Sequence, residues 1–275
     1  MGRRRPFPGG PSVRAGGLRG TTEGMTIAHR LTGTGDHHVL VLHDWFGTSA
    51  GWGPFLDYLD GDAFSYAFLD YRGYGQRKDV AGTYTLAEIA ADALALADQL
   101  GWDRFSLVGH SMGGKAAQQV LAEAPLRVRK LVGLAPVPAG AYPLDEAGEA
   151  LFYGAFEDRE KRRAILDLVT GQRAGRVWLD HMVDQSLRLS TPEAFGGYVR
   201  DWATADLEHR INGNPVPVKV IVGQHDLALT ADVMRGTFLA HYPNAELEEL
   251  GGSGHYPMYE TPVALAAALE GFLHN

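Results

Sequence analysis

Residues 109–113 read Gly-His-Ser-Met-Gly, a pattern that could present a serine as a nucleophile. The apolar run 105–108 before it is typical of a buried parallel strand, and the amphipathic segment 115–122 after it favours a helix. A strand that turns directly into a helix bends sharply, and small residues beside Ser111 permit the crowding. The helix N-terminus then offers backbone N–H groups to a developing anion. In a chain with 35 glycines this pattern is not sufficient alone, so other residues must support it.

Two later residues fit the partners that a nucleophilic serine requires. The hydroxyl needs a base to take its proton, and that base needs an orienting acid. Asp226 follows a strand expected at 216–223, and His255 follows one expected at 246–250. Because the carboxyl ends of parallel strands share one edge of a sheet, we expect these residues to meet there. Their order along the chain is also the one expected for this kind of turn.

Other titratable residues compete for these roles or have structural explanations. Asp206 and, more weakly, Asp70 are alternatives to Asp226, although Asp70 is expected to cap a turn near residues 72 and 73. Three further histidines are expected to bond backbone groups or face solvent: His43, His110 and His225. No histidines show a ligand spacing such as His-x-x-x-His, so we expect no metal and no cofactor.

An early loop is expected to complete the site. Acyl transfer needs two N–H donors aimed at the tetrahedral oxyanion. One is expected from the backbone of Met112, directly after the serine. The other is expected from the backbone of Trp45, in the stretch His-Asp-Trp-Phe-Gly at residues 43–47, which follows an apolar strand.

These motifs need a scaffold, and the chain predicts one by alternating strands with helices from residue 37 onward. The alternation implies an α/β fold with a mostly parallel central sheet and helices on both faces. We expect strands at 38–43, 65–70, 105–108, 130–134, 216–223 and 246–250. We expect helices at 86–100, 115–122, 231–240 and 262–273.

The alternation stops between residues 136 and 214, where helical patterns occur without a convincing strand. These helices are expected at 144–156, 159–169, 176–189 and 192–203. We interpret 136–214 as a helical cap inserted into a core made of 25–135 and 215–275. One or two aromatic residues of this cap should face the substrate, because excluding water strengthens the electrostatics of a site. The predicted pocket residues are Phe46, Phe152, Phe156, Trp178 and Trp202.

Taken together, these features resemble an α/β-hydrolase-fold protein with a helical cap, from about residue 25 to the C-terminus. The resemblance is carried by residues 43–47, 70–75, 109–114, 226 and 254–255. It implies that Ser111 is the nucleophile, His255 the general base and then acid, and Asp226 the orienting acid. The chain departs from the family at Asp44, where glycine is usual. Because a carboxylate aimed at the oxyanion would repel it, we expect this side chain to turn away and be hydrogen-bonded.

Composition limits the partners. The formal net charge of -8 disfavours nucleic acid or an anionic membrane as partner, and no apolar run approaches a transmembrane span. The absence of cysteine excludes a thiol nucleophile and a disulfide framework. Residues 1–24, rich in glycine, arginine and proline, are expected to form a disordered leader. A cytoplasmic location is the default expectation.

The sequence therefore predicts a serine hydrolase of the carboxylesterase type, acting on a small and fairly hydrophobic ester or lactone. A perhydrolase-like enzyme or a carbon–carbon bond hydrolase is also possible, since enzymes of both kinds use the same triad. A receptor or signalling module that keeps the triad is the alternative from another class. Oligomeric state cannot be inferred.

Overall fold

The computed structural model describes residues 26–275, so the leader expected at 1–24 lies outside the described residues. A seven-stranded sheet with the order β1-β3-β2-β4-β5-β6-β7 forms its centre. The β1–β3 pair is antiparallel and the other five pairs are parallel. The strands are β1 (His29–Thr32), β2 (His37–Leu42), β3 (Phe64–Leu69), β4 (Phe105–His110), β5 (Val128–Leu134), β6 (Val218–Gly223) and β7 (Ala245–Leu250).

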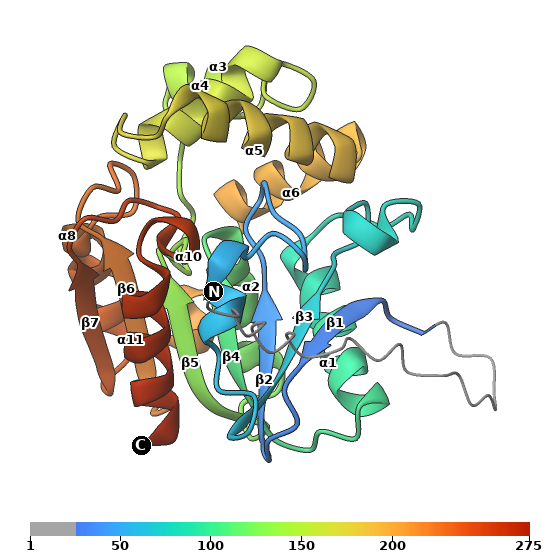
Figure 1. Cartoon of the computed structure of the whole chain (residues 1–275), viewed down its shortest axis with the longest axis vertical. Coiled ribbons are helices and arrows are strands. Elements are labelled where there is room, and N and C mark those ends of the chain that lie inside the picture. Colours follow the sequence, from blue (N-terminus) through green and yellow to red (C-terminus); the bar gives the residue numbers. More distant parts are fainter. Residues whose placement is uncertain (1–25) are drawn as a thin grey trace, which may run out of the picture.

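Helices cover both faces of this sheet (Figure 1). Helices α1 and α2 pack together on one face, while α11 covers the other beside a short 3-10 turn, η1 (Gly53–Tyr58). The core helices are α1 (Leu86–Gln99), α2 (Met112–Glu123), α8 (Ala231–Gly236), α9 (Phe238–His241), α10 (Pro257–Glu260) and α11 (Pro262–His274). The expected α/β architecture, with a mostly parallel sheet between two helical layers, is confirmed.

Local sequence signals determine where the elements begin and end. Helix α1 begins at the N-cap Thr85, whose side chain accepts the N–H of Glu88. The helix is followed by Gly101, whose φ of 71° lies in the left-handed region that glycine adopts without strain. Strands β3 and β4 are buried along their whole length, as expected for strands covered on both faces.

A further group of helices lies over the carboxyl edge of the sheet (Figure 1). In the chain these helices come between β5 and β6. The members of the group are α3 (Glu146–Phe152), α4 (Arg159–Val169), α5 (Arg176–Leu189) and α6 (Pro192–Thr204), followed by the single turn α7 (Glu208–Ile211). We propose that this group is the inserted cap expected at 136–214, and we call α3 to α6 the cap.

None of the helices described is both long and apolar enough to span a membrane. Within the same residues, no group of three or more metal-ligating side chains comes together.

Candidate active site

Ser111 stands at the turn between β4 and α2 in a strained backbone conformation. Its φ of 54° and ψ of -117° lie outside the regions that side chains other than glycine normally adopt. The neighbouring glycines make this turn possible. A Cβ atom at Gly109 would lie 2.3 Å from the carbonyl oxygen of Gly113, and one at Gly113 would lie 2.3 Å from that of Leu42. The small residues of the motif are therefore required by close backbone approach.

The turn is fixed by hydrogen bonds to the end of β5. The Ser111 N–H donates to the carbonyl of Leu134 at 2.9 Å, and the Ser111 carbonyl accepts the N–H of Val137, also at 2.9 Å. Hydrogen bonds of this kind hold a residue in a strained backbone conformation.

The structure pairs His255 with Asp226. His255 Nδ1 lies 2.6 Å from Asp226 Oδ2, and the other carboxylate oxygen accepts the N–H groups of Ala228 and Leu229. Since a carboxylate only accepts hydrogen bonds, Nδ1 carries the proton and Nε2 is the basic nitrogen of the neutral ring. Asp206 is exposed and caps its own turn, so it is not the partner of His255.

The two groups shift each other's pKa. Burial acts to lower the pKa of His255, but the Asp226 carboxylate at Nδ1 outweighs it and holds the pKa above its usual range. Burial acts to raise the pKa of Asp226, yet His255 and two backbone N–H groups hold it below its usual range. The pair is therefore arranged to stabilise an imidazolium ring at His255.

His110, inside the serine turn, has the structural role expected of it. Its Nε2 donates to the carbonyl oxygen of His255 at 2.8 Å. This bond ties the loop that carries His255 to the strand that carries Ser111. The expectation for His43 is also confirmed, since its Nδ1 bonds the carbonyl of Asp44 at 2.7 Å. Asp70 accepts the N–H of Gln76, beyond the turn at residues 72 and 73 that it was expected to cap, and also that of Ser49 in the early loop.

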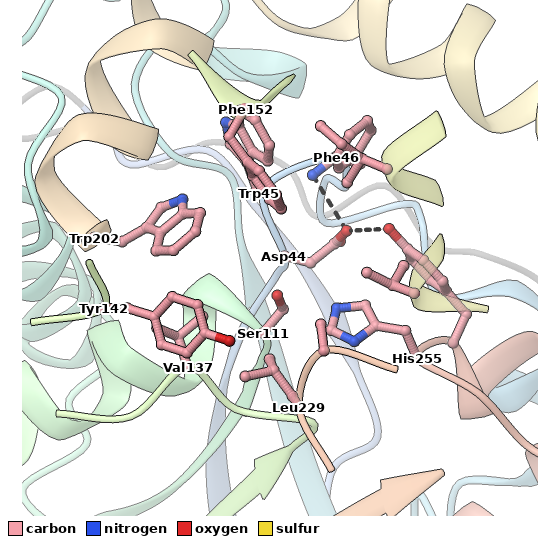
Figure 2. Close-up of a pocket in the computed structure, with 14 residues that line it drawn as sticks. Asp44, Trp45, Phe46, Ser111, Val137, Tyr142, Phe152, Trp202, Leu229 and His255 are labelled. Carbon is pink, nitrogen blue, oxygen red and sulfur yellow. Dashed lines mark hydrogen bonds between the residues drawn. The ribbon is translucent and has the colours of Figure 1, made fainter. Parts of the chain in front are cut away.

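Ser111 and His255 line one cavity beneath the cap (Figure 2). Its wall is largely apolar and comes from both the core and the cap. The aromatic members are Trp45, Phe46, Tyr142, Phe152, Trp202 and Tyr256, and the aliphatic members are Val137, Ile165, Val169, Ala228 and Leu229. Of the predicted pocket residues, Phe46, Phe152 and Trp202 are in this wall.

The other two pocket predictions are wrong. Phe156 follows α3 with 36% of its surface exposed and does not line the cavity. Trp178 lines a separate cavity, where it packs edge-on against Tyr256 and Tyr259. For Trp178 the reason is its position around α5. The buried face of this helix carries Leu179, Met182, Val183 and Ser186, and Trp178 lies outside it.

Three buried hydrogen bonds orient the early loop. The Tyr71 hydroxyl donates to the carbonyl of His43, and the Tyr74 hydroxyl donates to that of Trp45. The His43 ring holds the Asp44 carbonyl, as described above. In a trans peptide the C=O and N–H groups point in opposite directions, so fixing the Asp44 carbonyl also fixes the Trp45 N–H. Among residues 26–275, the structure gives no hydrogen-bond acceptor to the N–H of Trp45 or of Met112.

Asp44 is hydrogen-bonded, as expected. Its Oδ2 accepts the Tyr256 hydroxyl at 2.8 Å and the Phe46 N–H at 3.2 Å, both drawn in Figure 2. Its Oδ1 lies 3.7 Å from His110 Nδ1. Burial acts to raise the pKa of Asp44, but these neighbours outweigh it and lower the pKa to about 2. The carboxylate is therefore ionised near neutral pH and lies in the cavity wall.

Sequence reasoning missed Tyr142 and Tyr256 in the cavity wall. Tyr256 directly follows His255, a position next to a candidate catalytic residue that could have indicated it. Tyr142 stands before the first cap helix, and no pattern in the sequence distinguishes it from the other cap aromatics.

Comparison with known proteins matches the fold of this chain. Residues 37–262 match the family model described as alpha/beta hydrolase fold. A 2-hydroxy-6-oxononadienedioate/2-hydroxy-6-oxononatrienedioate hydrolase of Paraburkholderia phymatum is 29% identical over 269 residues, covering 88% of each chain. A pimeloyl-(acyl-carrier protein) methyl ester esterase of Nitrosomonas europaea is 26% identical, covering 86% of this chain and 95% of its own.

Solved structures show the same fold at lower sequence identity. A hydrolase from Oleispira antarctica has a TM-score of 0.81 at 17% identity, with 91% of this chain and 95% of that chain covered.

Proposed function

This chain belongs to the alpha/beta hydrolase fold family, and we propose that it is a serine hydrolase that cleaves uncharged carboxylic esters or related acyl compounds. One observation carries the proposal. His255, hydrogen-bonded to Asp226 at 2.6 Å, lines the same cavity as Ser111, which is held on a strained turn. This combination of an exposed hydroxyl, a base and an orienting acid is the one that acyl transfer requires.

In the first half of the reaction, Ser111 Oγ attacks the substrate carbonyl carbon and His255 Nε2 takes the hydroxyl proton. The tetrahedral intermediate carries a negative charge on the former carbonyl oxygen. The N–H groups of Trp45 and Met112 stabilise this oxyanion, since neither has an acceptor among residues 26–275. As the intermediate collapses, His255 gives its proton to the departing alkoxide and the acyl group remains on Ser111.

In the second half, a water molecule replaces the alcohol. His255 Nε2 takes a proton from the water, which attacks the acyl-enzyme carbonyl. Collapse of the second intermediate returns the proton to Ser111 Oγ and releases the carboxylic acid. The carboxylate of Asp226 stabilises the imidazolium in both halves without itself becoming protonated.

The cavity wall supports an uncharged substrate. Among the described residues that line it, none is a lysine or an arginine. The ionised Asp44 lies in the same wall and would repel a substrate carboxylate. An acyl or alcohol group that is apolar instead matches the aromatic and aliphatic lining.

Carbon–carbon bond hydrolysis is the second candidate, because the Paraburkholderia phymatum relative is named as the hydrolase of a dioate. The same serine, histidine and aspartate would serve an attack on a ketone carbonyl. A dianionic substrate, however, meets no lysine or arginine among the described residues that line this cavity. A carbon–carbon substrate of this chain would therefore be an uncharged diketone.

Labelling and turnover test the proposal together. We expect a fluorophosphonate probe to label Ser111 and the purified protein to hydrolyse short-chain p-nitrophenyl esters. Ser111→Ala should lose both, with turnover falling by about 10⁶-fold. Ser106→Ala is the matched control, because Ser106 lies on β4, the strand that leads to Ser111, but bonds His37 instead. Absence of labelling and of turnover in the wild type would favour the receptor alternative.

A further inference from the structure

Lys115 is fully buried in the first turn of α2, four residues after Ser111. Its Nζ donates to three backbone carbonyls, those of Gly140 at 2.7 Å, Trp202 at 2.8 Å and Ala205 at 2.7 Å. A buried lysine is rare unless its charge is compensated. An ammonium group has three N–H donors, and here each of them has one acceptor.

The three carbonyls belong to the two segments that connect the cap to the core. Gly140 lies on the segment that leads from β5 to α3, while Trp202 and Ala205 lie where α6 ends. Two backbone hydrogen bonds join these segments. Tyr142 N–H donates to Ala203, and Leu207 N–H donates to Ala139, each at 2.9 Å. Lys115 thus bonds both connections of the cap at the place where they run side by side.

The charge state of Lys115 suits this role. Burial lowers its pKa to about 8, while three carboxylates act in the opposite direction. These are Asp201 at the end of α6, Asp206 in the loop that follows, and Glu208 in α7. Near pH 7 the group is therefore mainly an ammonium with all three donors.

The same segments carry two walls of the cavity. Trp202, whose carbonyl accepts from Lys115, lines the cavity with its indole ring, and Tyr142 lines it two residues after Gly140 (Figure 2). A shift of either connection relative to α2 would move these rings relative to Ser111. Lys115 Nζ bonds the backbone carbonyls of these segments and not the rings of Trp202 or Tyr142. Lys115 would therefore affect the position of the rings through the backbone.

We propose that Lys115 is a positioning residue that sets the placement of the cap, and hence of Trp202 and Tyr142, relative to the helix that carries Ser111. In its effect on catalysis this inference rests on the proposed hydrolase function. The residue does not contact the reacting atoms. It therefore acts on substrate binding and not on the chemical step.

Steady-state kinetics separate this role from general stability. In Lys115→Met, which removes the donors and shortens the side chain by one heavy atom, we expect KM for a p-nitrophenyl ester to rise by at least about tenfold. We expect kcat to stay within about threefold, because the groups around Ser111, Asp226 and His255 remain in place.

The matched control is Lys130→Met. Lys130 also bonds backbone carbonyls, but they belong to Phe272 and Leu273 in the C-terminal helix, away from the cap. Its KM should equal that of the wild type. If KM is unchanged in Lys115→Met, or rises equally in both variants, the inference is overturned.

Hydrogen exchange tests the placement without turnover. We expect peptides covering 138–145 and 202–208 to exchange faster in Lys115→Met than in the wild type or Lys130→Met. Unchanged exchange would overturn the inference even if hydrolysis is observed. If the wild type hydrolyses no ester, the proposed function fails and exchange alone decides this inference. Should Lys115→Met not fold, Lys115→Gln, which is one atom shorter and keeps two donors, is judged by the same criteria.

Discussion

The core and the cap contribute to the candidate site by different physical means. The core supplies Ser111, Asp226 and His255 from strand ends, and short directional hydrogen bonds fix the turn and the loops that carry them. The cap supplies aromatic and aliphatic side chains such as Phe152 and Ile165, which line the cavity with apolar surface. Directional bonds tolerate little displacement, whereas apolar contacts accept substitutions of similar volume. In the proposed function the chemistry is therefore confined to the core, and the choice of substrate can vary in the cap.

The two regions are nevertheless joined at Trp45. Its backbone N–H is the proposed oxyanion donor, while its side-chain Nε1 donates to the Phe195 carbonyl in α6 at 2.8 Å. The two rings stack with centroids 4.0 Å apart, and the buried guanidinium of Arg162 lies 3.5 Å from the centroid of Phe195. A substitution in the cap that disturbed Phe195 would therefore reach the oxyanion loop.

The largest effect is expected in the core, from Asp226→Asn. An amide in place of the carboxylate no longer fixes the tautomer of His255 or stabilises its charged form, so kcat should fall by about 10⁴-fold. The measurement is steady-state hydrolysis of a p-nitrophenyl ester. Asp206→Asn is the matched control and should retain wild-type kcat, since Asp206 is exposed and does not contact His255.

The same pair predicts the pH dependence. His255 must be neutral to act as a base, and its pKa is raised above the usual 6.5. Thus kcat/KM of the wild type should rise with pH through a midpoint above 6.5. In Asp226→Asn the residual activity should have its midpoint at lower pH, because the neighbouring negative charge is lost. A midpoint that does not move would contradict the assignment of Asp226.

The next largest effect is expected from the charge of the substrate, because the residues that line the cavity come from both the core and the cap. The p-nitrophenyl esters of 4-methylpentanoic acid and of succinic acid are nearly isosteric, but the second carries a free carboxylate. We expect kcat/KM to be about 100-fold lower for the succinate ester, because its charge meets no cation in the cavity and faces Asp44. Equal values for the two esters would contradict the proposed preference and favour a dioate substrate.

The sequence predicted the secondary structure well in both regions, because its signals are local. Apolar runs, glycine punctuation and capping residues lie next to each other in the chain, so six strands of the core were found, together with the bounds of α4 and α5 in the cap. Strand β1 was missed, since it is a short antiparallel edge strand of four residues with two exposed positions. Its pairing with β3 depends on contacts that no local pattern encodes.

The cavity wall was predicted less well because it depends on distant contacts. Phe152 and Phe156 have the same side chain and are four residues apart, yet only Phe152 lines the cavity. Asp44 was expected to be hydrogen-bonded, but its partner Tyr256 lies 212 residues further along the chain. Helix α3 ends at Phe152, so Phe156 lies beyond it and does not continue its face. The end of a helix and long-range pairing thus decide details that composition cannot supply.

This pair of phenylalanines offers the next prediction. Removing the ring in Phe152→Ala should raise KM for a short-chain ester by about tenfold while kcat stays near the wild-type value, since only packing is lost. Phe156→Ala is the control, because its ring is partly exposed and outside the cavity. If kcat and not KM falls in Phe152→Ala, the cap takes part in the chemical step and the division between the regions is too simple.

The smallest effect is expected from Asp44→Asn, which lies where the two regions meet. The amide oxygen can still accept the Tyr256 hydroxyl and the Phe46 N–H, so the loop should keep its shape. The lost charge is one of those that raise the pKa of His255, and the acid limb of kcat/KM should therefore move to lower pH. We expect kcat at pH 8 to change by less than about fivefold.

Tyr256→Phe is the matched control for Asp44→Asn, since it removes the hydroxyl but keeps the Asp44 charge. It should leave the acid limb where the wild type has it or move it only slightly. A large rise in ester turnover in Asp44→Asn or Asp44→Gly would instead show that the carboxylate obstructs the oxyanion. In that case the departure from the family at Asp44 would limit the rate in the core and would no longer serve only to exclude anionic substrates.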